Sequence, residues 1–248
     1  MRELDARGHR CRVAWQPHVM RSRALIIEAA EYCNRADKAL ILGSGPLFDV
    51  PVAELSWRFQ EVVLVDILHL WRVRSALRRY PNVRLECLDV TGVVRQVHAT
   101  AHSGQALEPP DYKPVFFLED GYDLVISANI LSQLPLSPVR YVSRQKDQAA
   151  PEQTKAFSRR LVINHLDWLA SFDGNVCLMS DLERLYCNGD DILRREESLW
   201  GVTLPDGGQE WLWDLAPRPE IETDCDVRHR VAGYAAFPKK AWLERREV

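Results

Sequence analysis

The stretch Lys38-Ala-Leu-Ile-Leu-Gly-Ser-Gly-Pro46 decides the fold that we expect for this chain. It is a short apolar run that ends abruptly at Gly43 and Gly45. An apolar run bounded by turn residues is typical of a strand that is buried on both faces of a sheet. We therefore expect a buried strand that enters a tight loop at Gly43.

Four further short apolar runs lie at residues 61–66, 83–88, 123–127 and 175–180. Helical periodicity covers the stretches around them, and Pro17 and Pro51 suit the starts of two helices. The predicted helices cover residues 17–33, 69–80, 92–106 and 154–172, with one more that begins at Pro51. Strands that alternate with helices imply right-handed crossovers and a parallel sheet covered on both faces.

The end of the chain carries a different pattern. Two strand-like segments, residues 210–215 and 230–237, follow each other without a long helix between them. We expect them to form an antiparallel pair at one edge of the sheet. Trp211 and Trp213 share one face of the first segment, which favours a place in the core or at the sheet edge.

Composition and charge narrow the class of protein. The chain has 248 residues, 46% of them hydrophobic, and its 32 Lys and Arg against 35 Asp and Glu give a net charge of −3. This balance argues against a protein that holds nucleic acid by charge, and no apolar run approaches the roughly 18 residues that span a bilayer. The charged N-terminus also lacks the apolar stretch of a secretory signal. We expect one soluble domain in the cytoplasm.

The six cysteines are scattered along the chain without a C-x-x-C pair. We interpret them as reduced thiols, mostly packed as small apolar groups, and we expect no metal site.

Polar residues follow the predicted strands at their carboxyl ends, where an open parallel sheet binds ligands. Gly43 and Gly45 remove side chains where the backbone turns and a ligand can approach. Asp66 ends the second strand, where a carboxylate can accept hydrogen bonds from both hydroxyls of a ribose. Asp89 ends the third, where it can accept from an adenine amine while Val90 offers its N–H. Each feature also has an ordinary explanation, because the glycines fit a simple turn, Asp66 could be a helix cap and Asp89 could be a turn residue. The prediction of a nucleotide-like ligand therefore rests on their combination in this order and spacing.

The residues after Gly45 indicate which nucleotide. A dinucleotide site needs a third glycine and a helix N-terminus aimed at the pyrophosphate. Phe48 stands at that third position, Asp49 would bring a negative charge to a diphosphate, and the next helix begins late, near Pro51. S-adenosylmethionine carries no phosphate and fits this loop better, so a nicotinamide-dependent oxidoreductase is the weaker reading.

Residues 39–45, 63–66, 85–89 and 123–135 read ALILGSG, VLVD, LECLD and DLVISANILSQLP. Together these segments resemble the class I S-adenosylmethionine-dependent methyltransferases, over roughly residues 38–182. The resemblance implies an α/β fold with a Rossmann-like, doubly wound, mostly parallel seven-stranded sheet and an antiparallel C-terminal edge hairpin. We expect a single domain over residues 1–248, with an N-terminal helical cap at 1–37, a cofactor-binding core at 38–182 and edge strands at 183–248.

The resemblance also implies S-adenosylmethionine as the cofactor and assigns residues to it. The glycine loop and Asn129 would flank its methionine part, and the residues after the second and third strands would hold its ribose and adenine. The predicted cofactor-binding residues are Gly43, Ser44, Gly45, Asp66, Ile67, Asp89, Val90 and Asn129.

The chain departs from the family pattern at two places. Leu40 and Leu47 replace the acidic residue and the last glycine of the glycine-rich motif. Either Asp49 takes the role of the missing carboxylate, or the methionine ammonium is held differently. Residues 127–130 replace the Asn/Asp-Pro-Pro-Tyr/Phe signature, which argues against methylation of amino groups on nucleic-acid bases.

Methyl transfer from a sulfonium depends mainly on alignment and on the exclusion of water, and it needs a base only if the acceptor must lose a proton. Spacing therefore does not single out a catalytic residue. His18 and His165 are candidates, against the alternatives of an exposed helix-start histidine and a packed or solvent-facing one. Asp181 and Glu183 follow the fifth strand at the expected pocket rim, where Asp181 equally suits the cap of a following helix.

The segment at residues 137–146 is polar, basic and long enough to fold over the pocket. Gln133, Tyr141 and Arg144, together with Arg140, are candidates to bind an acceptor, including an anionic one, and a solvated loop is the alternative. We interpret the arginine-rich helix at residues 72–79 as a solvated face on the side away from the pocket.

These features predict an S-adenosylmethionine-dependent methyltransferase that acts on a small molecule, because no RNA- or DNA-binding module is visible. A protein or RNA methyltransferase would use the same core. From a different class, the chain could be a catalytically silent regulatory protein that binds the cofactor or a nucleoside. The acceptor and the oligomeric state are not readable from the sequence.

Overall fold

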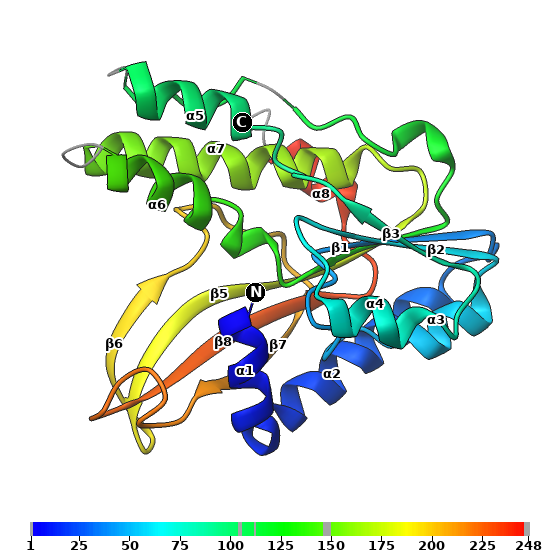
Figure 1. Ribbon diagram of the computed structural model, residues 1–248, viewed down its shortest axis with the longest axis horizontal. Coiled ribbons are helices and arrows are strands. Elements are labelled where there is room, and N and C mark those ends of the chain that lie inside the picture. The colour runs from blue at the N-terminus through cyan, green and yellow to red at the C-terminus, as the bar shows by residue number, and fades with distance from the viewer. Residues whose placement is uncertain (1, 104–105, 112, 146–149, 246–248) are drawn as a thin grey trace.

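The apolar runs form a mostly parallel sheet at the centre of the protein (Figure 1). The computed structural model describes residues 2–103, 106–111, 113–145 and 150–245. The strands are β1 (Lys38–Leu42), β2 (Glu61–Asp66), β3 (Val83–Cys87), β4 (Leu124–Ala128), β5 (Asn175–Asn188), β6 (Asp191–Glu197), β7 (Gln209–Ala216) and β8 (Asp226–Tyr234). Their order in the sheet is β3-β2-β1-β4-β5-β8-β7, and β6 pairs with β5 off this path.

The first five strands run parallel to one another. Leu40 of β1 lies between Val63 of β2 and Val125 of β4, and all three side chains are fully buried. Burial on both faces is what an uninterrupted apolar run requires. The chain moves outward from β1 to β2 and β3, and then returns to place β4 on the other side of β1, so the switch point of the sheet lies between β1 and β4.

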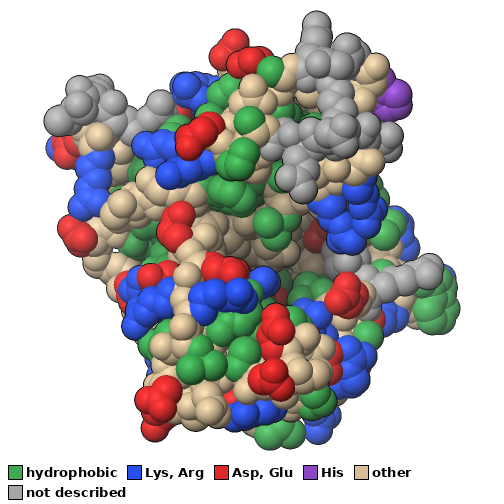
Figure 2. All heavy atoms as spheres, turned by 90° about the vertical axis from the view of Figure 1, so that its left-hand side faces the viewer, with side chains coloured by type: hydrophobic (Ala, Val, Ile, Leu, Met, Phe, Trp, Pro, Cys, Tyr) green, Lys and Arg blue, Asp and Glu red, His purple; other side chains and the backbone are tan. Residues whose placement is uncertain are grey.

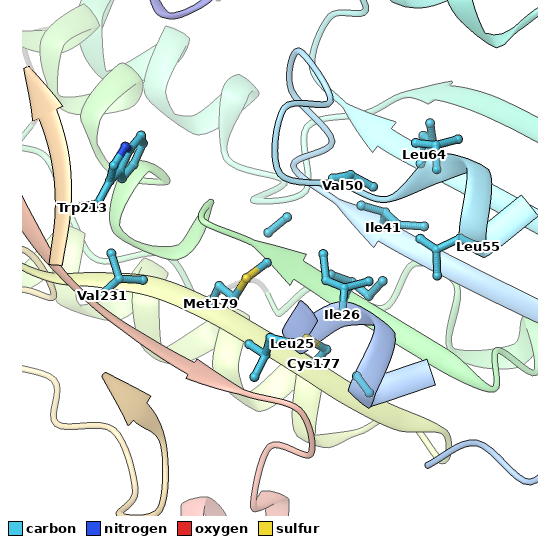
Figure 3. Close-up of a cluster of buried hydrophobic side chains, with 14 of the residues drawn as sticks. Leu25, Ile26, Ile41, Val50, Leu55, Leu64, Cys177, Met179, Trp213 and Val231 are labelled. Carbon is cyan, nitrogen blue, oxygen red and sulfur yellow. The ribbon is translucent and has the colours of Figure 1, made fainter. Parts of the chain in front are cut away.

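Helices cover both faces of the sheet (Figure 1). On one face lie α2 (Arg12–Glu31), α3 (Val52–Arg58) and α4 (Trp71–Leu77), and on the other lie α5 (Val94–Ser103), α6 (Leu136–Gln145), α7 (Pro151–Ala170) and α8 (Lys239–Glu244). Figure 3 shows the apolar core between the sheet and the helices of the first face, in which Leu25 and Ile26 of α2 pack with Ile41 of β1 and Met179 of β5. The predicted doubly wound fold is confirmed.

The C-terminal strands pair antiparallel, as predicted. β8 pairs with both β5 and β7 in antiparallel register, so the hairpin closes one edge of the sheet. Trp211 and Trp213 both lie on the buried face of β7. The seven strands of the main path match the predicted sheet, and β6 is an additional strand.

β6 was missed because its sequence lacks the apolar alternation of a half-buried strand. Every side chain of β6 is exposed, and β6 forms through its backbone pairing with the second half of β5. For the same reason β5 was predicted to end at residue 180, where charged residues begin, although it continues to Asn188. The expected domain division at residue 182 therefore falls inside a strand.

Two segments differ from the prediction: α2 begins earlier than expected, and residues 136–145 are helical. α2 begins at Arg12 rather than at Pro17, and a separate α1 (Arg2–Arg10) precedes it. Pro17 lacks an N–H to bond the carbonyl of Val13, but Val13 lies on the exposed side of the helix, where water can bind that carbonyl. Residues 136–145, which we considered as a loop, form α6, while residue 146 lies outside the described residues.

Among the described residues, no helix is both long enough and apolar enough to cross a membrane. The six cysteines, all within that part of the chain, are free thiols. No group of three or more His, Cys, Asp or Glu side chains in the described ranges is arranged to hold a metal ion.

Candidate functional site

The carboxyl ends of β1 to β4 open onto a cavity of about 590 Å³. Figure 2 shows that the face seen from the left of Figure 1 is hollowed across its middle, with acidic and basic side chains around the hollow. The predicted residues that line the cavity are Gly43, Gly45, Asp66, Ile67, Asp89, Val90, Asn129, Gln133, Tyr141 and His18. Ser44, Arg144 and His165 do not line it.

The two glycines of the loop after β1 serve different needs. Gly43 has φ +78°, and a Cβ there would approach the Ile130 side chain to 2.7 Å and the Ala128 carbonyl oxygen to 3.2 Å. Gly45 has φ +52°, and the nearest atom that its Cβ would meet is the Gly43 carbonyl oxygen, at 3.9 Å. Gly43 therefore permits the close approach of β4, whereas Gly45 leaves free space beside the cavity. Ser44 between them is fully buried.

Asp66 connects the end of β2 to this loop. Its Oδ2 accepts a hydrogen bond of 2.9 Å from the Gly45 N–H, and its Oδ1 accepts a longer one, 3.4 Å, from the Leu68 N–H. A carboxylate offers about four acceptor positions. Asp66 therefore shapes the glycine loop and keeps capacity for ligand hydroxyls in the cavity.

Asp89 holds the turn that follows β3. Its Oδ1 accepts from both the N–H and the hydroxyl of Thr91, at 3.0 and 2.6 Å, and its Oδ2 accepts from the Val94 N–H at the start of α5, at 3.3 Å. The alternative of a turn residue therefore describes this carboxylate well, although Asp89 also lines the cavity. Val90 is buried and adds an apolar surface beside it.

Asn129 lies just after β4 in a left-handed conformation, with φ +50°. Its Nδ2 donates to Asp49 Oδ2 at 3.2 Å and lies 3.3 Å from His18 Nε2. Asn129 is 5% exposed, and its Oδ1 accepts no hydrogen bond from the described residues. Because an unpaired buried amide oxygen is costly, this position is suited to a donor supplied by a ligand.

His18 lies on α2 against two tryptophans of β7. Its ring stacks on Trp213 with centroids 4.1 Å apart, and its Nδ1 accepts a 3.0 Å hydrogen bond from Trp211 Nε1. His18 is 2% exposed, and this burial lowers its pKa. It is therefore not the exposed helix-start histidine of the alternative interpretation. Trp213 also lines the cavity. The sequence predicted only that Trp213 lies in the core or at the sheet edge.

The N-terminal helices bring an aromatic and apolar wall to the same cavity. Leu4 of α1, Trp15 of α2 and Phe48 all line it, and the rings of Trp15 and Phe48 meet edge to face. A Cβ at Gly8 would lie 2.4 Å from the Phe48 ring, so α1 packs directly on this wall.

Arg72 fastens α1 to α4. Its guanidinium forms an ion pair with Asp5, contacts His9 Nε2 at 2.6 Å and lies over the Phe48 ring. The interpretation of the arginine-rich helix as a solvated face is therefore wrong for Arg72, because α1 covers it. Nothing in the spacing of α4 identified this partner.

His165 is a packed histidine inside the protein. Its Nε2 lies 2.9 Å from the Ser127 hydroxyl, and burial lowers the pKa of His165 to about 3. The contact joins α7 to β4, away from the cavity lining.

Asp181 is buried within β5, so its expected place after the strand and at the pocket rim is wrong. His229 Nδ1 lies 3.0 Å from Asp181 Oδ2, and the Ser132 hydroxyl donates to the same oxygen at 3.2 Å. Burial alone would raise the pKa of Asp181, but His229 and the hydrogen bonds lower it overall. The carboxylate thus anchors η2 (Leu131–Gln133) to the sheet. Glu183, also within β5, pairs with Arg230.

Residues on α5 and α6 form the opposite wall of the cavity. Tyr141 lines it together with His98 of α5, and their ring centroids lie 6.5 Å apart. Arg140 and Arg144 are exposed and are not part of the lining. The sequence did not identify His98 as a lining residue, because its place on a predicted helix does not indicate that its side chain faces the cavity.

No protein-family profile matches the chain, and no curated protein matches it either. Among solved structures, the chain is similar to the 1,6-didemethyltoxoflavin-N1-methyltransferase of Burkholderia thailandensis, solved with S-adenosylhomocysteine, at 15% identity and a TM-score of 0.37, over 92% of this chain and 86% of that one.

Two other methyltransferases were also found. The N-methyltransferase NodS of Bradyrhizobium japonicum has 10% identity and a TM-score of 0.36, over 86% of this chain and 94% of that one. An rRNA methylase of Streptococcus thermophilus has 13% identity and a TM-score of 0.33, over 82% and 91%. All three are methyltransferases, the class that the sequence segments resemble.

Proposed function

We propose that this chain is an S-adenosylmethionine-dependent methyltransferase that acts on a small-molecule acceptor. The observation that carries the proposal is the cavity at the switch point of the sheet. Every predicted cofactor residue except Ser44 lines it. Ligands of doubly wound α/β proteins bind at this edge of the sheet.

The lining offers a matching partner for each part of the cofactor. Asp49 and the unpaired Oδ1 of Asn129 suit the methionine ammonium. They would replace the acidic residue that the family motif has at the position of Leu40. Asp66 retains acceptor capacity for the ribose hydroxyls. Val90 and neighbouring apolar side chains suit the adenine, whereas the Asp89 carboxylate serves chiefly to hold the turn.

The cofactor would supply an electrophilic methyl group. As the acceptor's lone pair forms the new bond to the methyl carbon, the carbon–sulfur bond breaks and its electron pair stays with sulfur. The residues of this chain would align the two reactants and exclude water, which can provide most of the rate enhancement. The apolar wall of Leu4, Trp15 and Phe48 suits this exclusion of water.

Cofactor and acceptor would share one cavity of about 590 Å³, a volume within the roughly 300–1,000 Å³ of small-molecule sites. So little shared space favours a small acceptor. α1 packs over one wall and limits access from that side. A nucleophile with a free lone pair, such as an amine or a ring nitrogen, would react there without a protein base.

Calorimetric titration with S-adenosylhomocysteine, S-adenosylmethionine and NAD tests the proposal. We expect the two adenosyl compounds to bind and NAD not to bind. Replacing Asp66 with Ala should weaken S-adenosylhomocysteine at least about 10-fold, because it removes acceptors for two hydroxyls. Asp190→Ala, at an exposed site between β5 and β6, is the matched control and should bind as the wild type does.

Binding of NAD alone would contradict the choice of cofactor. Full affinity in Asp66→Ala would contradict the ribose assignment. Tight binding of the cofactor without methyl transfer to any member of broad amine, phenol and thiol panels would instead favour the catalytically silent binding protein.

A further inference from the structure

The environment of His18 determines which of its nitrogens carries the proton. An indole N–H is only a donor, and Trp211 Nε1 points it at His18 Nδ1 across 3.0 Å. Nδ1 must then be the acceptor, so the neutral imidazole carries its hydrogen on Nε2. Protonation of His18 would place two N–H groups against each other in a buried site.

The charged and titratable groups around His18 do not reverse this preference. Asp49 faces it from the loop after β1, Asp181 from β5 and His229 from β8. Burial is the largest influence on the pKa of His18 and lowers it, whereas the two carboxylates raise it by less. Burial therefore favours the neutral form of His18, in which Nδ1 accepts from Trp211 and Nε2 carries the hydrogen.

Among the described residues, the Nε2–H of His18 lacks a good acceptor. Nε2 contacts the Asn129 amide nitrogen at 3.3 Å, itself a donor to Asp49, and the Ser22 hydroxyl at 3.5 Å, the limit of a hydrogen bond. The free donor is therefore the Nε2–H of His18, which lies beside Asn129. The acceptors nearby are Asn129 Oδ1, which is unpaired, and the Asp49 carboxylate.

We infer that Trp211 is a positioning residue that holds His18 as a hydrogen-bond donor, and that the Nε2–H of His18 binds the carboxylate of the cofactor's amino-acid arm. The ligand part of this inference rests on the proposed function. An α-amino acid carries its ammonium and its carboxylate on one carbon, so an ammonium at Asp49 and Asn129 brings a carboxylate oxygen close to Nε2. His18 is accordingly not the base that accepts a proton from the methyl acceptor.

The first test uses ligand-free protein labelled with ¹⁵N at histidine. His18→Gln identifies the His18 signals by their loss. We expect the Nε2–H tautomer in the neutral form, with titration below the ordinary histidine value. An Nδ1–H tautomer, or titration of His18 near the ordinary histidine value, would overturn the inference without any reference to a cofactor.

Trp211→Phe tests whether Trp211 is responsible. Phenylalanine keeps an aromatic ring in the buried position but has no N–H, so His18 should show a mixture of tautomers and a raised pKa. Trp71→Phe, at an exposed position of α4, is the control and should leave the signals unchanged. An unchanged tautomer and pKa in Trp211→Phe would show that Trp211 does not position His18.

The second test compares S-adenosylhomocysteine with methylthioadenosine, which lacks the amino-acid arm. Glutamine can place an N–H near the site of Nε2, whereas asparagine is too short to do so. His18→Asn should weaken S-adenosylhomocysteine about 10-fold or more, since a hydrogen bond to a charged group is lost. It should leave methylthioadenosine nearly unchanged, and His18→Gln should recover most of the lost affinity.

The outcomes separate the inference from the function on which it rests. Equal losses for both ligands, or no loss for S-adenosylhomocysteine, would overturn the role of His18. Failure of the wild-type protein to bind either nucleoside would overturn the proposed function, while the tautomer measurement would still decide the role of Trp211.

Discussion

At the residue scale, the partner of a side chain decides what that side chain can do. His18 and His165 are both buried on helices, but one receives an indole N–H beside the cavity and the other meets a serine hydroxyl inside the core. Asp66 ends β2 and Asp89 lies just after β3, but Asp89 satisfies the N–H groups of its own turn. Residue type and position along the strand did not distinguish these cases.

His165 gives a prediction about pH. Burial lowers its folded-state pKa to about 3 from 6.5, so the unfolded chain binds the extra proton between these values. Stability is therefore lost as pH falls below the unfolded value, by about 1.4 kcal/mol per pH unit from this group. His165→Gln removes the titration and can keep a polar contact with Ser127.

Urea unfolding at about pH 7 and pH 4.5 measures this difference. On acidification, the wild type should lose about 2.5 kcal/mol more than His165→Gln. The contribution of His18 is common to both proteins and cancels in the comparison. Equal losses in the two proteins would mean that His165 is not held neutral.

At the element scale, two segments far apart in the sequence complete the cavity built by the parallel strands. α1 covers the aromatic wall and is held by the Asp5–Arg72 ion pair and by Glu220, which pairs with Arg7 and Arg10. β7 supplies Trp211 and Trp213, which fix and stack on His18. The N-terminal helices and the edge hairpin thus line the cavity as well as pack in the core.

Gly8→Val tests the contribution of α1. A side chain there would collide with the Phe48 and Trp15 rings, at 2.4 to 2.9 Å, so α1 must move away from the wall. We expect binding of S-adenosylhomocysteine to weaken at least about 5-fold, with a loss of unfolding free energy of about 1–3 kcal/mol from overpacking.

Ala6→Val is the matched control, because it adds the same β-branched side chain at an exposed position of α1. Its affinity for S-adenosylhomocysteine should equal that of the wild type within experimental error. If Gly8→Val lost stability but kept full affinity, α1 would be a structural element without influence on the site.

At the scale of the whole molecule, the cavity joins three distant parts of the chain. His18 comes from α2, Asn129 follows β4 and Trp213 comes from β7, and all three line the same space. A ligand that touches all of them couples the N-terminal helices, the parallel sheet and the edge hairpin.

Hydrogen exchange with and without S-adenosylhomocysteine tests this coupling. Saturation at about 100 times Kd should add roughly 2.7 kcal/mol to the free energy of unfolding. We expect slower amide exchange in α2 and β7 as well as in the loops after β1 and β2. Protection confined to those two loops would show that the nucleoside does not engage the N-terminal and C-terminal elements.

Short apolar runs and glycines were enough to predict the parallel sheet, the antiparallel hairpin and the glycine loop, because they act through local backbone preferences and burial. The sequence also located the strand-end residues, since parallel strands bring their carboxyl ends together. By contrast, the contacts of Trp211 with His18, of Arg72 with Asp5 and of β6 with β5 are seen only in the folded chain. These contacts join residues that no periodic pattern links, so they depend on how distant elements pack.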